Sequence, residues 1–143
     1  MKRSLLVIAF GISFLIVMTW MGTILVDAIP RPPTAQVQVA QAGPYRISLQ
    51  VEPNPPPITQ SSTLSIQLSN KKTQQLVSNA HVSAEMVMET MDMRTDRVDA
   101  TMQSEGVYVI PIQFTMSGPW QVRVHVQVPG TTAQSTVFEV TAQ

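Results

Sequence analysis

Methionine is the residue type in this chain with the most distinctive chemistry. Nine methionines occur among the 143 residues, and there is no cysteine. Six of the nine follow residue 80, and four of those six lie within residues 86–93. A thioether is a soft, neutral ligand that needs no deprotonation, so it suits Cu(I) better than it suits hard cations. The spacing therefore predicts a candidate Cu(I) site in this part of the chain.

The methionines fall into two groups by their place in the apolar pattern. Met86, Met88 and Met102 fit the inward phase of predicted strands, where a flexible thioether fills gaps in a core. Met91 and Met93 follow the apparent end of a strand, where no core pattern requires an apolar side chain. For these two, a ligand role or a contact surface is the favoured interpretation.

The two histidines, His81 and His125, are the other candidate ligands or bases. Both fall on the polar, outward phase of predicted strands, and neither can be paired with a nucleophile from the sequence. An exposed structural role is favoured for each, and a mixed His/Met metal site is the less favoured alternative. Serine-hydrolase, phosphate-loop, dinucleotide and zinc-protease motifs are all missing from the sequence. These features predict that the protein is not an enzyme.

The composition excludes several other kinds of site. Nine basic and nine acidic residues give a formal net charge of zero, without the basic patch that nucleic-acid binding needs. The lack of cysteine excludes disulfides, thiolate metal sites and cysteine-linked lipids. The acidic residues between Glu85 and Asp99 lack the alternate spacing and central glycine of a calcium loop. They are interpreted as a solvated face.

Residues 1–27 are predicted to form a transmembrane anchor. Residues 4–26 carry no charge and would span roughly 34 Å as a helix, enough to cross a hydrocarbon core of about 30 Å. The apolar part of a signal peptide is usually only about 7–15 residues long, so an uncleaved anchor is favoured over a cleaved signal. Lys2 and Arg3 precede the apolar run, which places the N-terminus in the cytoplasm and the rest of the chain on the periplasmic side of the inner membrane.

The exported part is predicted to consist of a linker and one β domain. Residues 28–42 begin with three prolines among the first six positions, which favours an extended spacer. From Gly43 to the end of the chain, at residue 143, apolar and polar residues alternate with period two. Alternating strands are expected at 45–51, 64–68, 82–88 and 120–128, with further strands at 97–103, 107–115 and 134–141. About seven strands without a helical period predict an all-β, immunoglobulin-like antiparallel β-sandwich.

Four short motifs in residues 43–142 resemble the YtkA-like, FixH-like domain family. They are Gly43-Pro44-Tyr45, Met88-x-x-Met91-x-Met93, Gly106-x-Tyr108 and Phe114-x-Met116-x-Gly118-x-Trp120. The resemblance implies a small exported or membrane-anchored β-sandwich, often found in copper-handling or oxidase-assembly contexts. It also implies that the candidate metal ligands are Met88, Met91, Met93 and Met116.

Two functional hypotheses follow, and they are compatible with each other. In the first, Met91, Met93 and Met116, with Met88, bind Cu(I) for transfer to a membrane-bound oxidase or carrier. In the second, the protein binds no metal and is a single-pass accessory subunit of a respiratory or photosynthetic electron-transfer complex. Its methionine-rich loop is then a deformable contact surface. Both hypotheses place the anchor in the lipid bilayer, and neither involves nucleic acid.

Overall fold

A computed structural model describes residues 11–20, 34–88, 90, 93–94 and 96–143. The chain divides into two compact units, Met1–Pro32 and Pro33–Gln143. In the first unit, residues 11–20 are helical and exposed. None of the described helical residues forms a helix long and apolar enough to cross a bilayer. Most of the predicted anchor, 1–27, lies outside the described residues.

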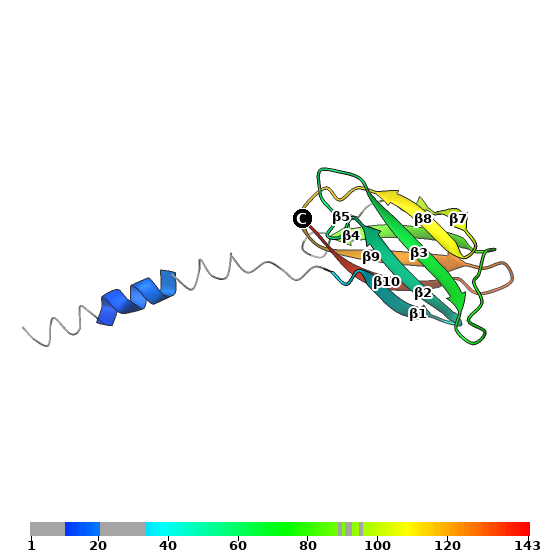
Figure 1. Ribbon diagram of the computed structural model, residues 1–143, viewed down its shortest axis with the longest axis horizontal. Helices are drawn as coiled ribbons and strands as arrows, with labels where there is room; N and C mark the ends of the chain where they lie inside the picture. The colour runs from blue at the N-terminus through cyan, green and yellow to red at the C-terminus, as the bar shows by residue number, and fades with distance from the viewer. Residues whose placement is uncertain (1–10, 21–33, 89, 91–92, 95) are drawn as a thin grey trace, which may run out of the picture. The chain divides into compact units, whose positions relative to one another are not determined.

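The second unit is built from two antiparallel sheets (Figure 1). The first sheet contains, in spatial order, β1 (Val37–Ala42), β2 (Tyr45–Glu52), β3 (Ser62–Asn70), β8 (Val107–Ile112) and β7 (Thr101–Ser104). The second sheet contains, in order, β10 (Gln134–Ala142), β9 (Gly118–Gln127), β4 (His81–Met88) and β5 (Met93–Arg94), and β6 (Val98–Asp99) also pairs with β4. The prediction of an antiparallel all-β domain is thereby confirmed.

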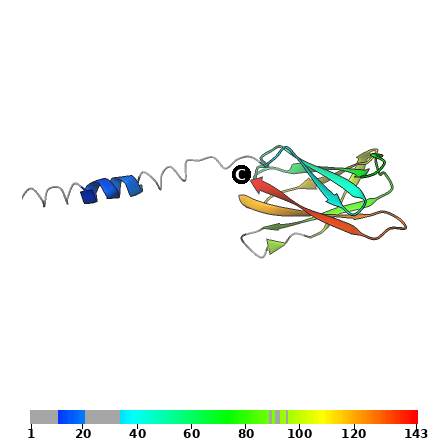
Figure 2. The same ribbon diagram turned by 90° about the horizontal axis from the view of Figure 1, so that it is seen from below.

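The two sheets stack face to face, as the edge-on view in Figure 2 shows. Alternation along each long strand buries one face of each sheet against the other, because successive side chains point to opposite faces. The largest fully buried side chains are Trp120 and Phe114, and they belong to one continuous core. The predicted place of Trp120 in the core is confirmed.

The strand predicted at 97–103 is divided between the two sheets. Residues 98–99 pair with β4 as β6, and residues 101–104 pair with β8 as β7. The chain crosses between the sheets at Ala100, whose backbone N–H donates to the carbonyl of Val82 at 2.8 Å. The sandwich has more strands than the predicted seven, because this predicted strand is divided in two and because β1 and the short β5 were not among the predicted strands.

The sandwich begins earlier than the predicted domain boundary at Gly43. Residues 37–42, which belong to the predicted 28–42 linker, form β1 and pair with β2. Gly43 and Pro44 make the tight turn between the two strands, and Gly43 has a positive φ of 58°. The prolines that favour a spacer all precede residue 34, so the following alternating residues are free to pair.

The segment around β1 also protects the outer edge of β10. The Gln38 side chain donates to the carbonyl of Glu139 and accepts from its N–H, which imitates a neighbouring strand. The Thr34 hydroxyl accepts a hydrogen bond from the N–H of Thr141 at 2.8 Å. Backbone groups that an edge strand would leave unpaired are therefore satisfied by side chains from another segment.

Candidate metal-binding site

The end of the second sheet brings part of the predicted methionine set together. Met93 on β5, Met88 on β4 and Trp120 on β9 are successive partners across the three strands. This end of the sandwich also holds the last residues of β10, at the marked C-terminus in Figure 1. Met91 lies outside the described residues, and Met93 is described only in its backbone position.

Met88 packs in the core next to a glycine that leaves room for its methyl group. Its side chain is 5% exposed and belongs to the main apolar cluster, which confirms the packing predicted for it. Gly118 has a φ of 131°, and a Cβ built there would lie 3.2 Å from the Met88 Cε. Both the backbone conformation and the close methyl group favour glycine at this position.

Met116 lies in the connection between β8 and β9, and its backbone is hydrogen-bonded to Trp120. Its backbone carbonyl accepts a hydrogen bond from Trp120 Nε1 at 3.0 Å, and its side chain is partly buried against the core. The ring of Trp120 meets that of Phe114 edge to face, with centroids 5.6 Å apart and planes inclined by 64°. Met88 and Met116 are therefore both neighbours of Trp120.

Replacement of Gly118 by alanine tests whether this glycine positions Met88. We expect Gly118→Ala to lower the free energy of unfolding by more than about 1 kcal/mol, because it combines a strained φ with a crowded Cβ. Gly130→Ala is the matched control, since Gly130 also has a positive φ, of 79°, but nothing lies within 4 Å of a Cβ built there. Urea denaturation of both variants measures the difference. Equal losses would mean that the contact with Met88 contributes nothing.

The other two methionines differ in burial. Met86 is buried in the core, as predicted. Met102 pairs with the buried Tyr108, as its predicted inward phase requires, yet its side chain is 50% exposed. The prediction of core packing is wrong for Met102, because β7 is at the edge of the first sheet and a bulge interrupts its pairing after this residue.

The two histidines lie on the outward face of the second sheet, which confirms their predicted orientation. His125 Nε2 is 3.2 Å from Arg97 Nη2 and 3.6 Å from Glu85 Oε1, and His81 Nε2 is 3.4 Å from Asp99 Oδ1. Among the described side chains, both imidazoles are on the opposite face of the sheet from Met86 and Met88, which are on the inward face of β4. Among the described residues, no three His, Asp or Glu side chains are close enough together to hold a metal ion.

Glu85 is more buried than the sequence predicts. The acidic residues from Glu85 to Asp99 are expected to form a solvated face, but Glu85 lies within β4 with a side chain only 11% exposed. Arg123 Nη1 donates to its Oε1 at 3.0 Å from the neighbouring position on β9. Burial alone would raise the pKa of Glu85, but the Arg123 hydrogen bond and the charges of His125 and Arg123 hold that pKa below its ordinary value of 4.5.

The chain is similar to known proteins in sequence and in fold. A sequence profile of the family described as YtkA-like matches residues 39–125. A search of curated proteins found no match.

Three solved structures share the fold. FetP from uropathogenic Escherichia coli has a TM-score of 0.56 at 10% identity, over 80% of this chain and 97% of FetP. A copper-bound variant of the same FetP has a TM-score of 0.56 at 9% identity, over 78% of this chain and 92% of that one. A DUF4426 family protein from Pseudomonas aeruginosa has a TM-score of 0.52 at 13% identity, over 74% of this chain and 94% of that one.

Proposed function

Because this chain belongs to the YtkA-like family, we propose that it is a non-enzymatic, extracytoplasmic accessory module that binds Cu(I) through methionine thioethers. Residues 1–27 anchor it in the inner membrane, and the immunoglobulin-like sandwich is on the periplasmic side. The metal is passed to a membrane-bound oxidase or another electron-transfer complex. The candidate ligands are Met91, Met93 and Met116, with Met88.

One observation carries the proposal. Met93, Met88 and Trp120 are in register at one end of the sandwich, and the Met116 carbonyl accepts a hydrogen bond from the same tryptophan. Residues from three separate segments of the chain therefore meet at one place. A copper-bound variant of FetP, which has the same fold, adds support from outside the chain.

The chemistry of the ligands suits transfer better than storage. Thioethers bind Cu(I) without losing a proton, so the set of ligands is neutral and its affinity for the ion does not depend on competition with protons. Met88 is buried, so its sulfur would complete the site from the core side, whereas Met116 is partly exposed. A thioether-only site lacks the negative charge of a thiolate and is expected to release its ion to a partner more readily than a thiolate site would.

An anaerobic titration of the full-length protein with Cu(I), against a chromophoric chelator, tests the proposal. We expect one equivalent to bind, and we expect Met91→Leu/Met93→Leu and Met116→Leu each to weaken binding by about tenfold or more, a loss of about 1.4 kcal/mol. Leucine has nearly the volume of methionine but no sulfur, so it tests the ligand without a large change in packing.

Met102→Leu is the matched control, because Met102 is exposed on β7 and belongs to the other sheet. Its affinity for Cu(I) should equal that of the unmodified protein. Equal weakening in Met102→Leu would indicate non-specific binding to exposed thioethers. Failure to compete for copper at all would remove the metal hypothesis and leave the metal-free accessory subunit, which co-purification with a membrane complex in mild detergent would then test.

A further inference from the structure

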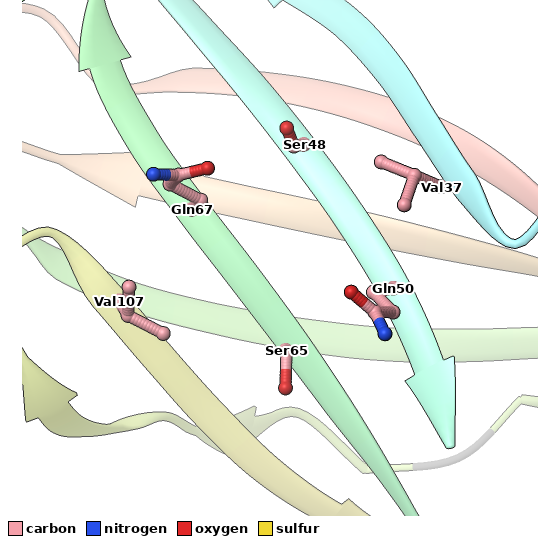
Figure 3. Close-up of a pocket in the computed structure, with 6 residues that line it drawn as sticks. All are labelled: Val37, Ser48, Gln50, Ser65, Gln67 and Val107. Carbon is pink, nitrogen blue, oxygen red and sulfur yellow. The ribbon is translucent and has the colours of Figure 1, made fainter. Parts of the chain in front are cut away.

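The outward face of the first sheet has an unusual pattern of large and small side chains at its centre. Figure 3 shows Ser48 and Gln50 on β2 next to Gln67 and Ser65 on β3. The register pairs Ser48 with Gln67 and Gln50 with Ser65, so each serine has a glutamine beside it both along and across the strands. Beside the two serines lies an open hollow of about 280 Å³, which is lined by these four side chains together with Val37 and Val107.

Valines border this polar centre on both sides. Val37 and Val39 on β1 pair with Gln50 and Ser48, and their side chains are 51% and 50% exposed. On the other side, β8 contributes two further half-buried valines at 107 and 109, which pair with Gln67 and Ser65. The centre of the face thus consists of two neighbouring rows that run across the strands. The rows are Val37-Gln50-Ser65-Val109 and Val39-Ser48-Gln67-Val107. None of these eight side chains carries a charge.

Opposite charges stand at the two ends of this face. Arg46 and Glu52 are exposed on β2, one position beyond Ser48 and Gln50 on the same face. The side-chain amide of Gln50 donates a hydrogen bond to Glu52 Oε1 at 2.6 Å, which holds the carboxylate on the outward face of β2. The outward residues along β2 are therefore, in order, a basic residue (Arg46), a small one (Ser48), a larger one (Gln50) and an acidic one (Glu52).

We propose that this face binds the same face of a second copy of this chain. The two-fold axis runs across the strands, midway between the two rows, above Leu49 of β2 and Ile66 of β3, which are themselves partners in the register. A rotation about this axis places each strand over its own copy in the opposite direction. Symmetric dimers of this kind use one self-complementary patch on both subunits.

The rotation brings complementary side chains together at every position. Ser48 faces Gln50 of the second copy, and Ser65 faces Gln67, so each large side chain enters the hollow left by a small one. The valines of β1 face one another, as do the valines of β8. Arg46 faces Glu52 of the second copy, and the symmetry produces this pair twice. Stacked sheets keep their strands within about 30° of each other and lie about 10 Å apart, a geometry that permits these contacts.

Charge reversal in the full-length protein in detergent tests the proposal. We expect the molar mass from light scattering to rise toward that of a dimer with concentration. Arg46→Glu and Glu52→Arg should each raise the dissociation constant of the dimer by about tenfold, because attraction becomes repulsion at two symmetric places. The double variant Arg46→Glu/Glu52→Arg restores both pairs with their signs exchanged, so its dissociation constant should return toward the original one.

Lys71→Glu and Glu105→Arg are matched controls, since both residues are exposed in turns outside this face. Neither should change the dissociation constant. A monomer at every concentration would overturn the proposal. Two other results would place the interface elsewhere and would also overturn the proposal. One is a dimer whose dissociation constant is unchanged in both single variants. The other is a double variant whose dissociation constant stays as high as that of the single variants.

Discussion

Trp120→Ala is expected to lower the free energy of unfolding by about 3–5 kcal/mol. The side chain is only 2% exposed and is the largest member of the core. Its removal would leave a cavity in the core. It would also end the edge-to-face contact with Phe114, and the loss of this contact lowers the stability further than the loss of buried area alone. Urea denaturation followed by circular dichroism measures the change.

Trp120→Phe separates the packing of the ring from its hydrogen bond. Phenylalanine retains an aromatic ring against Phe114 but cannot donate to the carbonyl of Met116. We expect a smaller loss of stability, in which the lost hydrogen bond accounts for about 1 kcal/mol. If Met116 is a copper ligand, the same variant should also weaken Cu(I) binding. An unchanged affinity for copper would show that the tryptophan stabilises the sandwich without positioning the ligand.

The regular part of the fold could be predicted because its signal is local. Alternation over 45–51 and 120–128 corresponds to β2 and β9, and the further strand expected at 134–141 corresponds to β10. β5 and β6 have two residues each, too few to show a period, and they exist because β4 offers them a free edge. Their presence depends on tertiary pairing, which a local pattern does not contain.

The candidate site depended more strongly on information that is not local. The sequence identified Met88 and Met116 as members of one set, but Trp120 as their shared neighbour follows only from the pairing of β4 with β9. The environment of Glu85 also depends on the pairing of β4 with β9. Its period-two phase correctly placed it outward, yet only the register sets it beside Arg123 and buries it.

The pairing of Glu85 with Arg123 predicts a stability that depends on pH. Glu85→Gln should lower the free energy of unfolding by about 2 kcal/mol at neutral pH, since it replaces a charge-assisted hydrogen bond with a neutral one. Arg123 is 39% exposed, and water screens part of the interaction, which keeps the loss below that of a fully buried pair. Asp99→Asn is the control, because Asp99 and its partner His81 are largely exposed and should contribute little.

The sign of the pH dependence follows from the direction of the pKa shift. The folded state holds the pKa of Glu85 below 4.5, so the unfolded chain binds a proton more readily than the folded one. The stabilisation is therefore complete above that ordinary value and is lost as the pH falls through the lower pKa of the folded state. The difference between the unmodified protein and Glu85→Gln should shrink over the same interval in urea titrations. A difference that stayed constant through this interval would mean that Glu85 stabilises the sheet by its shape and neutral hydrogen bonding, because only a charge-dependent contribution can be removed by a proton.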